Sequence, residues 1–358
     1  MNKIRVAIAG VGNAASAFYQ SILFYSNQGS RGDPDNFQQA IGPYKIQDVE
    51  IVAAFDIGQP KVGKRLSDAI FEKPNVLPKM VEVMTDSGPI VRKGPVLDGI
   101  GDSVDEILKE STAPEESVNE VLQQADAEIL VALLPTGAHK ATERYAEEAL
   151  QAEVGFINCT PTKIASTREW GQKFKRASLP LVGDDLQSML GGTRIHKGIL
   201  ELLNAYGAKI EATYQLDVSG GLEGLNTLEV GRRLAKRAVK SEAIRQAVPY
   251  LPVDKVASGT TDYMDFLENR RVGFFWIEGA YFMDAPFQLD ISYKSLDGPN
   301  AAAMLVDIVR ATRIAMDRVI DGPLVSVSAH GFKCPPLFTN EYNARVWFSE
   351  FLEGKRNA

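Results

Sequence analysis

A glycine-rich turn near the start of the chain has the residue types and spacing that bind a pyrophosphate. Gly10, Gly12, Asn13, Ala14 and Ala15 follow an apolar run and open a helical pattern in the order G-x-G-x-x-A. The first glycine allows a tight turn, the second lets the backbone approach a phosphate, and the small third residue lets the helix pack on its strand. The helix N-terminus adds free N–H groups for the anion. The turn predicts a dinucleotide site, although glycine-rich turns also occur in α/β proteins that bind no nucleotide.

An acidic residue ends the next long apolar run, where a dinucleotide site needs an acceptor for the adenosine ribose. Asp56 lies 44 positions beyond Gly12, rather than the usual spacing of about 20. An insertion at residues 27–48 accounts for the difference. A carboxylate at this place would repel a 2′-phosphate, which favours NAD over NADP. The basic residues between 61 and 65 weaken that preference.

Charged residues in the second half of the chain are candidates for acid–base or oxyanion chemistry. Lys236 and Lys240 are four residues apart, so a helix puts both ammonium groups on one face. Asp184 and Asp185 follow a strand-like run, and Lys333 lies in a turn-prone segment near the C-terminus. Each also has a plain structural interpretation, as a solvated helix face, a helix cap or a surface loop.

The composition is typical of a globular protein from a reducing compartment. The chain has 358 residues, 45% of them hydrophobic and 24% charged, and at about 150 residues per domain this predicts two domains. A net charge of −7 disfavours nucleic-acid binding, and no apolar run approaches the roughly 18 residues of a membrane helix. The two cysteines, Cys159 and Cys334, exclude a disulfide framework and a four-cysteine zinc site, and they suit the cytoplasm.

The first half of the chain alternates apolar strand-like runs with helical patterns. This alternation predicts an α/β fold with a Rossmann-type doubly wound parallel sheet. One of the predicted helices covers residues 61–70. Residues 27–48 and 71–112 are rich in Gly, Pro, Asp and Asn, and we expect long loops there, which are often functional in compact domains.

The pattern changes near residue 188 to long strands around a basic helix. Strands are expected at 212–219, 272–282 and 286–293, the last two as an antiparallel hairpin, and the helix at 225–240. More sheet is present here than a small domain covers by itself, so we expect a homo-oligomer. The expected division is a Rossmann domain of residues 1–190 and 301–358, interrupted by an inserted α+β domain of residues 191–300.

The chain resembles the myo-inositol-1-phosphate synthase family, in its shorter bacterial and archaeal form. The resemblance covers most of the chain, and its matching segments occur in the family's order and spacing. They are GVGNAAS at 10–16, GPYKIQDVEIVAAFD at 42–56, KVGKRLSDAIF at 61–71, GPVLDGIG at 94–101, LLPTG at 133–137, PLVGDDLQS at 180–188, LDGPNAA at 296–302 and GFKCPP at 331–336.

The resemblance implies a fold and a reaction. The fold is a dinucleotide domain with an inserted catalytic domain whose sheet builds a homotetramer. The reaction is an isomerisation of D-glucose 6-phosphate to 1D-myo-inositol 3-phosphate with tightly held NAD. The sugar is oxidised at C5, enolised at C6, closed by aldol attack on C1 and reduced, so that NAD is recycled.

The same resemblance implies roles for residues that match the family's motifs. Anionic oxygens develop at C5 and C1, where lysines that donate hydrogen bonds stabilise them, and a phosphate needs lysine and hydroxyl partners. The implied catalytic residues are Lys236, Lys240, Lys333, Asp297 and Arg271. Those for substrate are Ser188, Asn226, Gly221 and Glu223, and those for the cofactor are Gly10, Gly12, Asn13, Ala14, Asp56, Asp98 and Asp185.

Three positions depart from the family's pattern. Arg271 stands where the family has a lysine, and a guanidinium cannot act as a base. Gly221 stands where the family has an asparagine, ahead of Glu223 in place of an aspartate. Gln187 replaces the lysine of the G-D-D-x-K-S string.

These departures leave other functions open. The chain is either an inositol-phosphate synthase or a relative that runs the same cycle on another sugar phosphate, such as fructose 6-phosphate closing to a cyclopentane. A dehydrogenase that releases NADH and a non-catalytic NAD-binding protein are weaker alternatives. The sequence decides neither the sugar nor the need for a metal ion.

Overall fold

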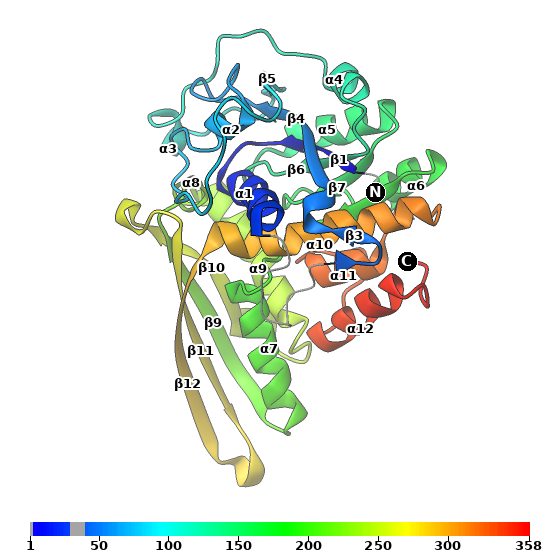
Figure 1. Cartoon of the computed structure of the whole chain (residues 1–358). Coiled ribbons are helices and arrows are strands. Elements are labelled where there is room, and N and C mark those ends of the chain that lie inside the picture. The colour runs from blue at the N-terminus through cyan, green and yellow to red at the C-terminus, as the bar shows by residue number, and fades with distance from the viewer. Residues whose placement is uncertain (1–2, 29–39) are drawn as a thin grey trace.

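A seven-stranded parallel sheet forms the larger part of the molecule (Figure 1). The computed structural model describes residues 3–28 and 40–358. The strand order is β13-β8-β7-β6-β1-β4-β5, with every neighbouring pair parallel. Apolar runs that are buried on both faces favour this arrangement. The strands are β1 (Ile4–Ala9), β4 (Val49–Asp56), β5 (Val91–Lys93), β6 (Ile129–Ala132), β7 (Gly155–Asn158), β8 (Pro180–Gly183) and β13 (Gly322–Pro323).

Helices cover both faces of this sheet, which confirms the predicted doubly wound fold. On one face α1 (Asn13–Gln28) and α10 (Asp297–Asp317) pack together, with Phe18 and Ile308 buried in the same core. The short helix α11 (Val325–Gly331) and α12 (Glu341–Leu352) complete this side. The other face carries α4 (Val118–Gln124), α5 (His139–Gln151) and α6 (Arg168–Arg176).

A four-stranded sheet in the order β10-β9-β11-β12 forms the second part of the molecule. The predicted hairpin is present as the antiparallel pair β11 and β12, which projects away from the larger sheet (Figure 1). One face packs on α7 (Gly192–Ala205) and α9 (Val230–Arg245). The strands are β9 (Lys209–Ser219), β10 (Val256–Tyr263), β11 (Arg270–Ala280) and β12 (Pro286–Leu296). All of these elements lie between the two parts of the chain that build the larger sheet, and the exact division into two domains stays a prediction.

Two predicted helices were wrong in their extent. The basic helix expected at 225–240 is interrupted between α8 (Leu222–Asn226) and α9, where Thr227 donates its hydroxyl to the carbonyl of Gly224. The helix expected at 61–70 is reduced to α2 (Leu66–Ala69), because Gly63 at φ +86° lies in the left-handed region and breaks the helical path.

The two predicted loops contain short elements. Half of the loop expected at 27–48, residues 29–39, lies outside the described residues. After it come β2 (Ala40–Ile41), β3 (Tyr44–Lys45) and the 3₁₀ turn η1 (Ile46–Asp48). The segment 71–112 is mostly irregular and contains β5 and α3 (Asp102–Asp105), while the remaining 3₁₀ turns are η2 (Val253–Lys255), η3 (Asp265–Leu267) and η4 (Phe282–Asp284). In the part of the chain that the structure describes, none of the helices has the length and hydropathy to cross a membrane.

Candidate active site

A single large cavity brings the predicted site residues together. It measures about 390 Å³ and lies where the carboxyl ends of β1 and β6 meet the inserted sheet. Ligands of open α/β sheets bind at this place, because the strand connections diverge there. The cavity is lined by all residues predicted for cofactor, substrate or catalysis, namely Gly10, Gly12, Asn13, Ala14, Asp56, Asp98, Asp185, Ser188, Gly221, Glu223, Asn226, Lys236, Lys240, Arg271, Asp297 and Lys333.

The glycine turn has the shape that a pyrophosphate requires. Gly10 has φ +96°, and a Cβ there would lie 2.6 Å from the carbonyl oxygen of Leu133. A Cβ on Gly12 would meet no atom of residues 3–28 or 40–358 within 4 Å, so the space in front of this residue is open to the cavity. The N-terminus of α1 begins at Asn13 beside it. Backbone N–H groups and the positive end of the helix therefore face a space of the right kind for a dinucleotide.

Asp56 lies directly beside this turn. Its Oδ2 accepts from the N–H of Val11 at 2.8 Å, and its Oδ1 accepts from the N–H groups of Ile57 and Gly58 at 2.8 Å each. Oδ2 therefore keeps one further lone pair for a ribose hydroxyl, whereas both lone pairs of Oδ1 are used by the backbone. Lys61 is buried at 3.8 Å from Asp56 and donates to the carbonyl of Val11, so this lysine belongs to the cofactor end of the cavity.

Asn13 and Asp98, which were also predicted to bind the cofactor, accept hydrogen bonds from the backbone of neighbouring segments. The side-chain oxygen of Asn13 accepts from the N–H groups of Val76 and Leu77 at 2.8 and 3.0 Å. Asp98 accepts from the N–H groups of Lys140 and Ala141 at the start of α5. Their direct contact with a cofactor stays a prediction.

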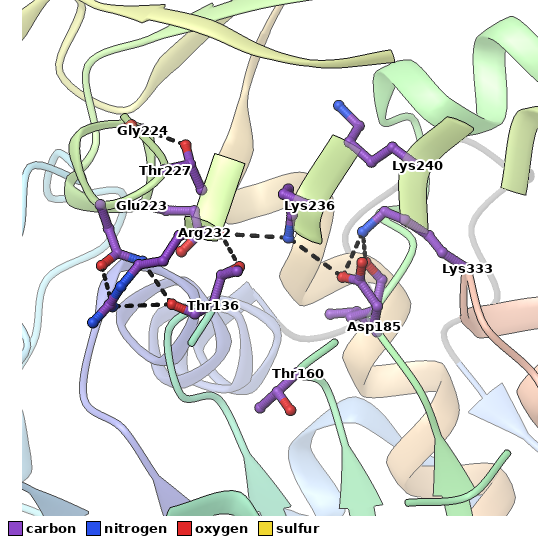
Figure 2. A network of polar contacts seen from close by, with 12 residues as sticks. Thr136, Thr160, Asp185, Glu223, Gly224, Thr227, Arg232, Lys236, Lys240 and Lys333 are labelled. Atoms are coloured by element: carbon purple, nitrogen blue, oxygen red, sulfur yellow. Dashed lines mark hydrogen bonds and ion pairs between the residues drawn. The ribbon is translucent and has the colours of Figure 1, made fainter. Parts of the chain in front are cut away.

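One carboxylate joins two of the predicted lysines. Lys333 donates to Oδ1 of Asp185 at 2.8 Å, and Lys236 lies 3.5 Å from the same oxygen (Figure 2). Asp185 is 2% exposed, and its Oδ2 has no hydrogen-bond partner among the described residues. Buried polar atoms are rarely left unpaired in native proteins, so a ligand hydroxyl or amide is the natural partner for this oxygen.

The two lysines differ in their protonation. Burial is the larger influence on Lys333 and lowers its pKa to about 8 despite the attraction of Asp185. Burial also lowers the pKa of Lys236, but Asp185 and Glu223 outweigh it and the net shift is upward. Burial raises the pKa of Asp185, and the two ammonium groups more than compensate, so this carboxyl stays ionised. Lys333 is therefore suited to proton transfer near neutral pH and Lys236 to permanent positive charge.

A second carboxylate, that of Asp217, lies close to the other two predicted cations, Lys240 and Arg271. Asp217 is fully buried on β9, forms an ion pair with Lys240 and lies 3.7 Å from a guanidinium nitrogen of Arg271. Arg271 also donates through Nε and Nη2 to one oxygen of Asp297, at 2.7 and 2.6 Å. Gln215 donates its amide to both oxygens of Asp217. Asp217, Lys240, Arg271 and Asp297 thus form the floor of the site, in which each cation is paired with a carboxylate.

Burial and the nearby guanidinium determine the protonation of this floor. Burial lowers the pKa of Lys240, and Arg271 lowers it further against the attraction of Asp217. Burial also opposes the charge of Arg271, but Asp297 and Asp217 raise its pKa above the ordinary arginine value. Arg271 is a permanent cation, whereas Lys240 is the more easily deprotonated of the two.

The residues predicted for substrate lie above this floor. Glu223 accepts from the hydroxyl of Thr136 at 2.8 Å and lies 3.3 Å from Lys236. Asn226 donates to the carbonyl of Thr136 at 2.9 Å. Ser188 lies on the loop that leads into α7, and the missing side chain of Gly221 leaves space next to Asn13. Contact between these residues and a sugar stays a prediction.

The three departures from the family's pattern have distinct structural settings. Arg271 is held by Asp297 and Asp217, as described above. Gln187 donates to Glu341 at 2.7 Å, and Glu341 also pairs with Lys197 at 2.6 Å, so a positive charge reaches this carboxylate from α7. Gly221 has no side chain, and a Cβ there would lie 3.5 Å from the side-chain nitrogen of Asn13.

The sequence interpretation missed several residues of the cavity. Asp217, Gln215 and Ser219 alternate on β9 with their side chains inward and buried. The signal was present, because three polar residues at period two on the buried face of a strand are unexpected in an apolar core. Thr136 lies in the matching segment at 133–137 but was assigned no role. Among the described residues, no three His, Cys, Asp or Glu side chains are grouped as metal ligands.

Comparisons with known proteins identify the family of the chain. The family model for myo-inositol-1-phosphate synthase matches residues 191–298. Inositol-3-phosphate synthase of Mycolicibacterium smegmatis is 37% identical, with 98% of each chain covered. The crystal structure of Ari2 is 29% identical with a TM-score of 0.77 over 99% of each chain. A myo-inositol-1-phosphate synthase-related protein of Thermotoga maritima, 22% identical over 98% of this chain and 99% of its own, has the same fold at a TM-score of 0.80. The chain belongs to the myo-inositol-1-phosphate synthase family.

Proposed function

We propose that this protein is an NAD-dependent inositol-3-phosphate synthase that converts D-glucose 6-phosphate to 1D-myo-inositol 3-phosphate. The observation that carries the proposal is the cavity itself. It joins an open glycine turn at one end to four cations, held by four carboxylates, at the other. A reaction that oxidises, cyclises and reduces one sugar needs both ends within reach of the same molecule.

The turn at Gly10–Ala14 and the carboxylate of Asp56 would hold NAD. The open space in front of Gly12 and the N-terminus of α1 fit its pyrophosphate. Bound NAD⁺ would supply a hydride acceptor and, once reduced, the donor that returns the hydride. The chain's own contribution is to bind the sugar, exclude water and move protons at defined atoms.

Lys333 is the proposed base of the enolisation. Its side chain is 11% exposed, its pKa is about 8, and Asp185 orients its ammonium group. Lys236 remains charged and would donate to the oxygen that becomes negative next to the enolised carbon. Hydrogen bonds aimed at developing charge are the largest contribution in many enzymes, with losses on the order of 10²–10³ in rate when one is removed.

The other pair of cations would serve the aldol closure and the phosphate. Lys240 and Arg271 line the cavity at Asp217, and Arg271 is pinned by Asp297. We propose that they polarise the C1 aldehyde and bind anionic oxygen. Ser188 and the N-terminus of α7, which line the same cavity, would hold the phosphate.

We propose a homotetramer, as the family resemblance implies, and the inserted sheet supports association between copies. Its face away from α7 and α9 carries Leu216 and Phe274, 37% and 45% exposed, beside the stacked rings of Tyr214 and Trp276. Apolar side chains on an open sheet face favour association with another copy. We also propose a cytoplasmic location, since both cysteines are unpaired.

The test is incubation of the purified protein with NAD⁺ and either D-glucose 6-phosphate or fructose 6-phosphate, followed by NMR of the product. The proposal predicts inositol phosphate from glucose 6-phosphate. A cyclopentane product from fructose 6-phosphate alone would identify a relative with another substrate. Stoichiometric NADH would indicate a dehydrogenase, and no product at all from either sugar would favour a binding protein.

A further inference from the structure

Arg232 joins three separate segments at the edge of the cavity. It lies in the first turn of α9, and its Nη1 donates to the carbonyl of Thr136 at 3.1 Å and to the amide oxygen of Asn226 at 2.5 Å. Its Nε pairs with Glu229 at 2.8 Å. Glu229 in turn lies within 3.4–3.5 Å of the N–H and hydroxyl of Ser103 on α3. One guanidinium therefore ties the inserted part to two wall segments of the dinucleotide part.

The backbone around Arg232 is shaped to receive it. A Cβ at Gly137 would lie 3.0–3.1 Å from the guanidinium, and a Cβ at Gly101 would lie 2.8 Å from its Nη2. Both glycines have positive φ, +102° and +91°, which other residues rarely adopt. Two wall loops thus enclose the same side chain.

The contacts of Arg232 lead on to the reacting end of the cavity. Thr136, whose carbonyl Arg232 holds, donates its hydroxyl to Glu223, and Glu223 lies 3.3 Å from Lys236 (Figure 2). Residues 95–100 and Thr136 line the cavity, whereas Arg232 does not. Arg232 acts through its neighbours and touches no space that a substrate would fill.

We infer that Arg232 and Glu229 form a latch that closes the walls at 95–104 and 134–138 over the cofactor and slows its release. This inference rests on the proposed function. An enzyme that oxidises and then reduces the same sugar fails whenever NADH leaves between the two events. Walls tied to the inserted part meet that requirement, because the cofactor leaves only after these contacts break. Arg232 is thus a positioning residue with an effect on cofactor residence.

The latch is tested by the dissociation rate of NADH, measured in a stopped-flow instrument from its fluorescence after a chase with excess NAD⁺. The protein is used without any sugar, so the result is independent of turnover. Arg232→Met is expected to raise the dissociation rate about tenfold or more, since changes in affinity appear mostly in the off-rate. Arg237→Met is the matched control, because Arg237 is exposed on the same helix, and it is expected to leave the rate unchanged.

Two further variants keep the test decisive. Arg232→Lys keeps the charge beside Glu229 and is expected to recover part of the residence time. Glu229→Gln is expected to raise the rate as well, and the double variant to add little, because both residues belong to one latch. A wild-type dissociation rate in Arg232→Met and Glu229→Gln, with unchanged melting temperatures, overturns the inference. Failure of the wild type to form inositol phosphate would overturn the proposed function and leave this result standing.

Discussion

The two ends of the cavity are lined by different kinds of chemical group. At the cofactor end Gly10 and Gly12 form the turn, apolar residues such as Val96 and Leu97 line the wall, and one ion pair, Asp56 with Lys61, lies beside the turn. At the reacting end the floor consists of buried charges, such as Lys240 on Asp217 and Lys333 on Asp185. The cofactor end depends on the path of the backbone and tolerates side-chain substitutions that leave this path unchanged. The reacting end depends on the chemical type of each side chain.

The largest expected effect is at the charged end. Lys240→Ala is expected to lower turnover on glucose 6-phosphate by on the order of 10²–10³, because it removes a cation from the floor. The affinity for NAD, measured by fluorescence titration, is expected to stay within about twofold, because the glycine turn is not involved. Unchanged turnover in this variant would contradict the assignment of Lys240 to the chemistry.

A stability measurement separates charge from catalysis at the same place. Lys240→Ala leaves the fully buried Asp217 with Arg271 at 3.7 Å as its remaining cation, and uncompensated buried charges cost about 3–5 kcal/mol. The double variant Asp217→Asn/Lys240→Ala is expected to recover much of that loss in urea unfolding without recovering activity. Recovery of activity together with stability would mean that Lys240 has only a structural role.

At the other end the expected effect is on binding. Gly12→Val fills the open space in front of the turn and is expected to weaken NAD binding by about 100-fold or more. The melting temperature is expected to change little, because no atom of the described residues lies within 4 Å of a Cβ there. Gly198→Ala is a control, because Gly198 has equally open surroundings far from the turn. Tight NAD binding by Gly12→Val would refute the dinucleotide site.

The pH dependence tests the role of Lys333. Its pKa is lowered to about 8 by burial, so the neutral base becomes available as the pH rises through that value. The rate constant kcat/KM is therefore expected to rise about tenfold per pH unit below pH 8 and to level off above it. Lys333→Arg, which cannot lose its proton, is expected to be nearly inactive at every pH. A profile that falls between pH 7 and 9 would assign Lys333 a charged role instead.

The smallest expected effect concerns Arg271. Arg271→Lys restores the residue type of the family and keeps one cation beside Asp297. Activity on glucose 6-phosphate is expected to stay within about tenfold of the wild type or to rise, because a lysine meets the same need for positive charge. A larger loss, with activity on another sugar phosphate affected most, would indicate that the guanidinium fork selects a different substrate.

The sequence predicts features with a local pattern better than contacts between distant elements. The glycine turn, the parallel sheet and the hairpin have local patterns, and these predictions were confirmed for the fold. Lys236 and Lys240 were correctly expected on one helix, but spacing alone did not indicate that they pair with different carboxylates, Asp185 and Asp217. Those partners lie on other elements, and their roles came only from the family resemblance or, for Asp217, from the structure.

Two misses have clear physical reasons. The strand β10 was not predicted, because its inward residues Ser258 and Thr260 belong to the polar end of the sheet and give no apolar alternation. Arg232 was not singled out, because its partner Thr136 is 96 positions away in the chain. Contacts of this kind arise from the arrangement of the elements, which a local pattern does not encode.

The most direct test of the account follows one hydride. Glucose 6-phosphate deuterated at C5 is incubated with the protein and a large excess of unlabelled NAD⁺, and the inositol phosphate is examined by NMR and mass spectrometry. If both ends of the cavity act on one sugar that stays bound throughout, the deuterium returns to the carbon derived from C5. Free NADH then does not accumulate. Loss of the deuterium from the product, or its appearance in the free NADH pool, would contradict the claim that one closed cavity carries the whole reaction.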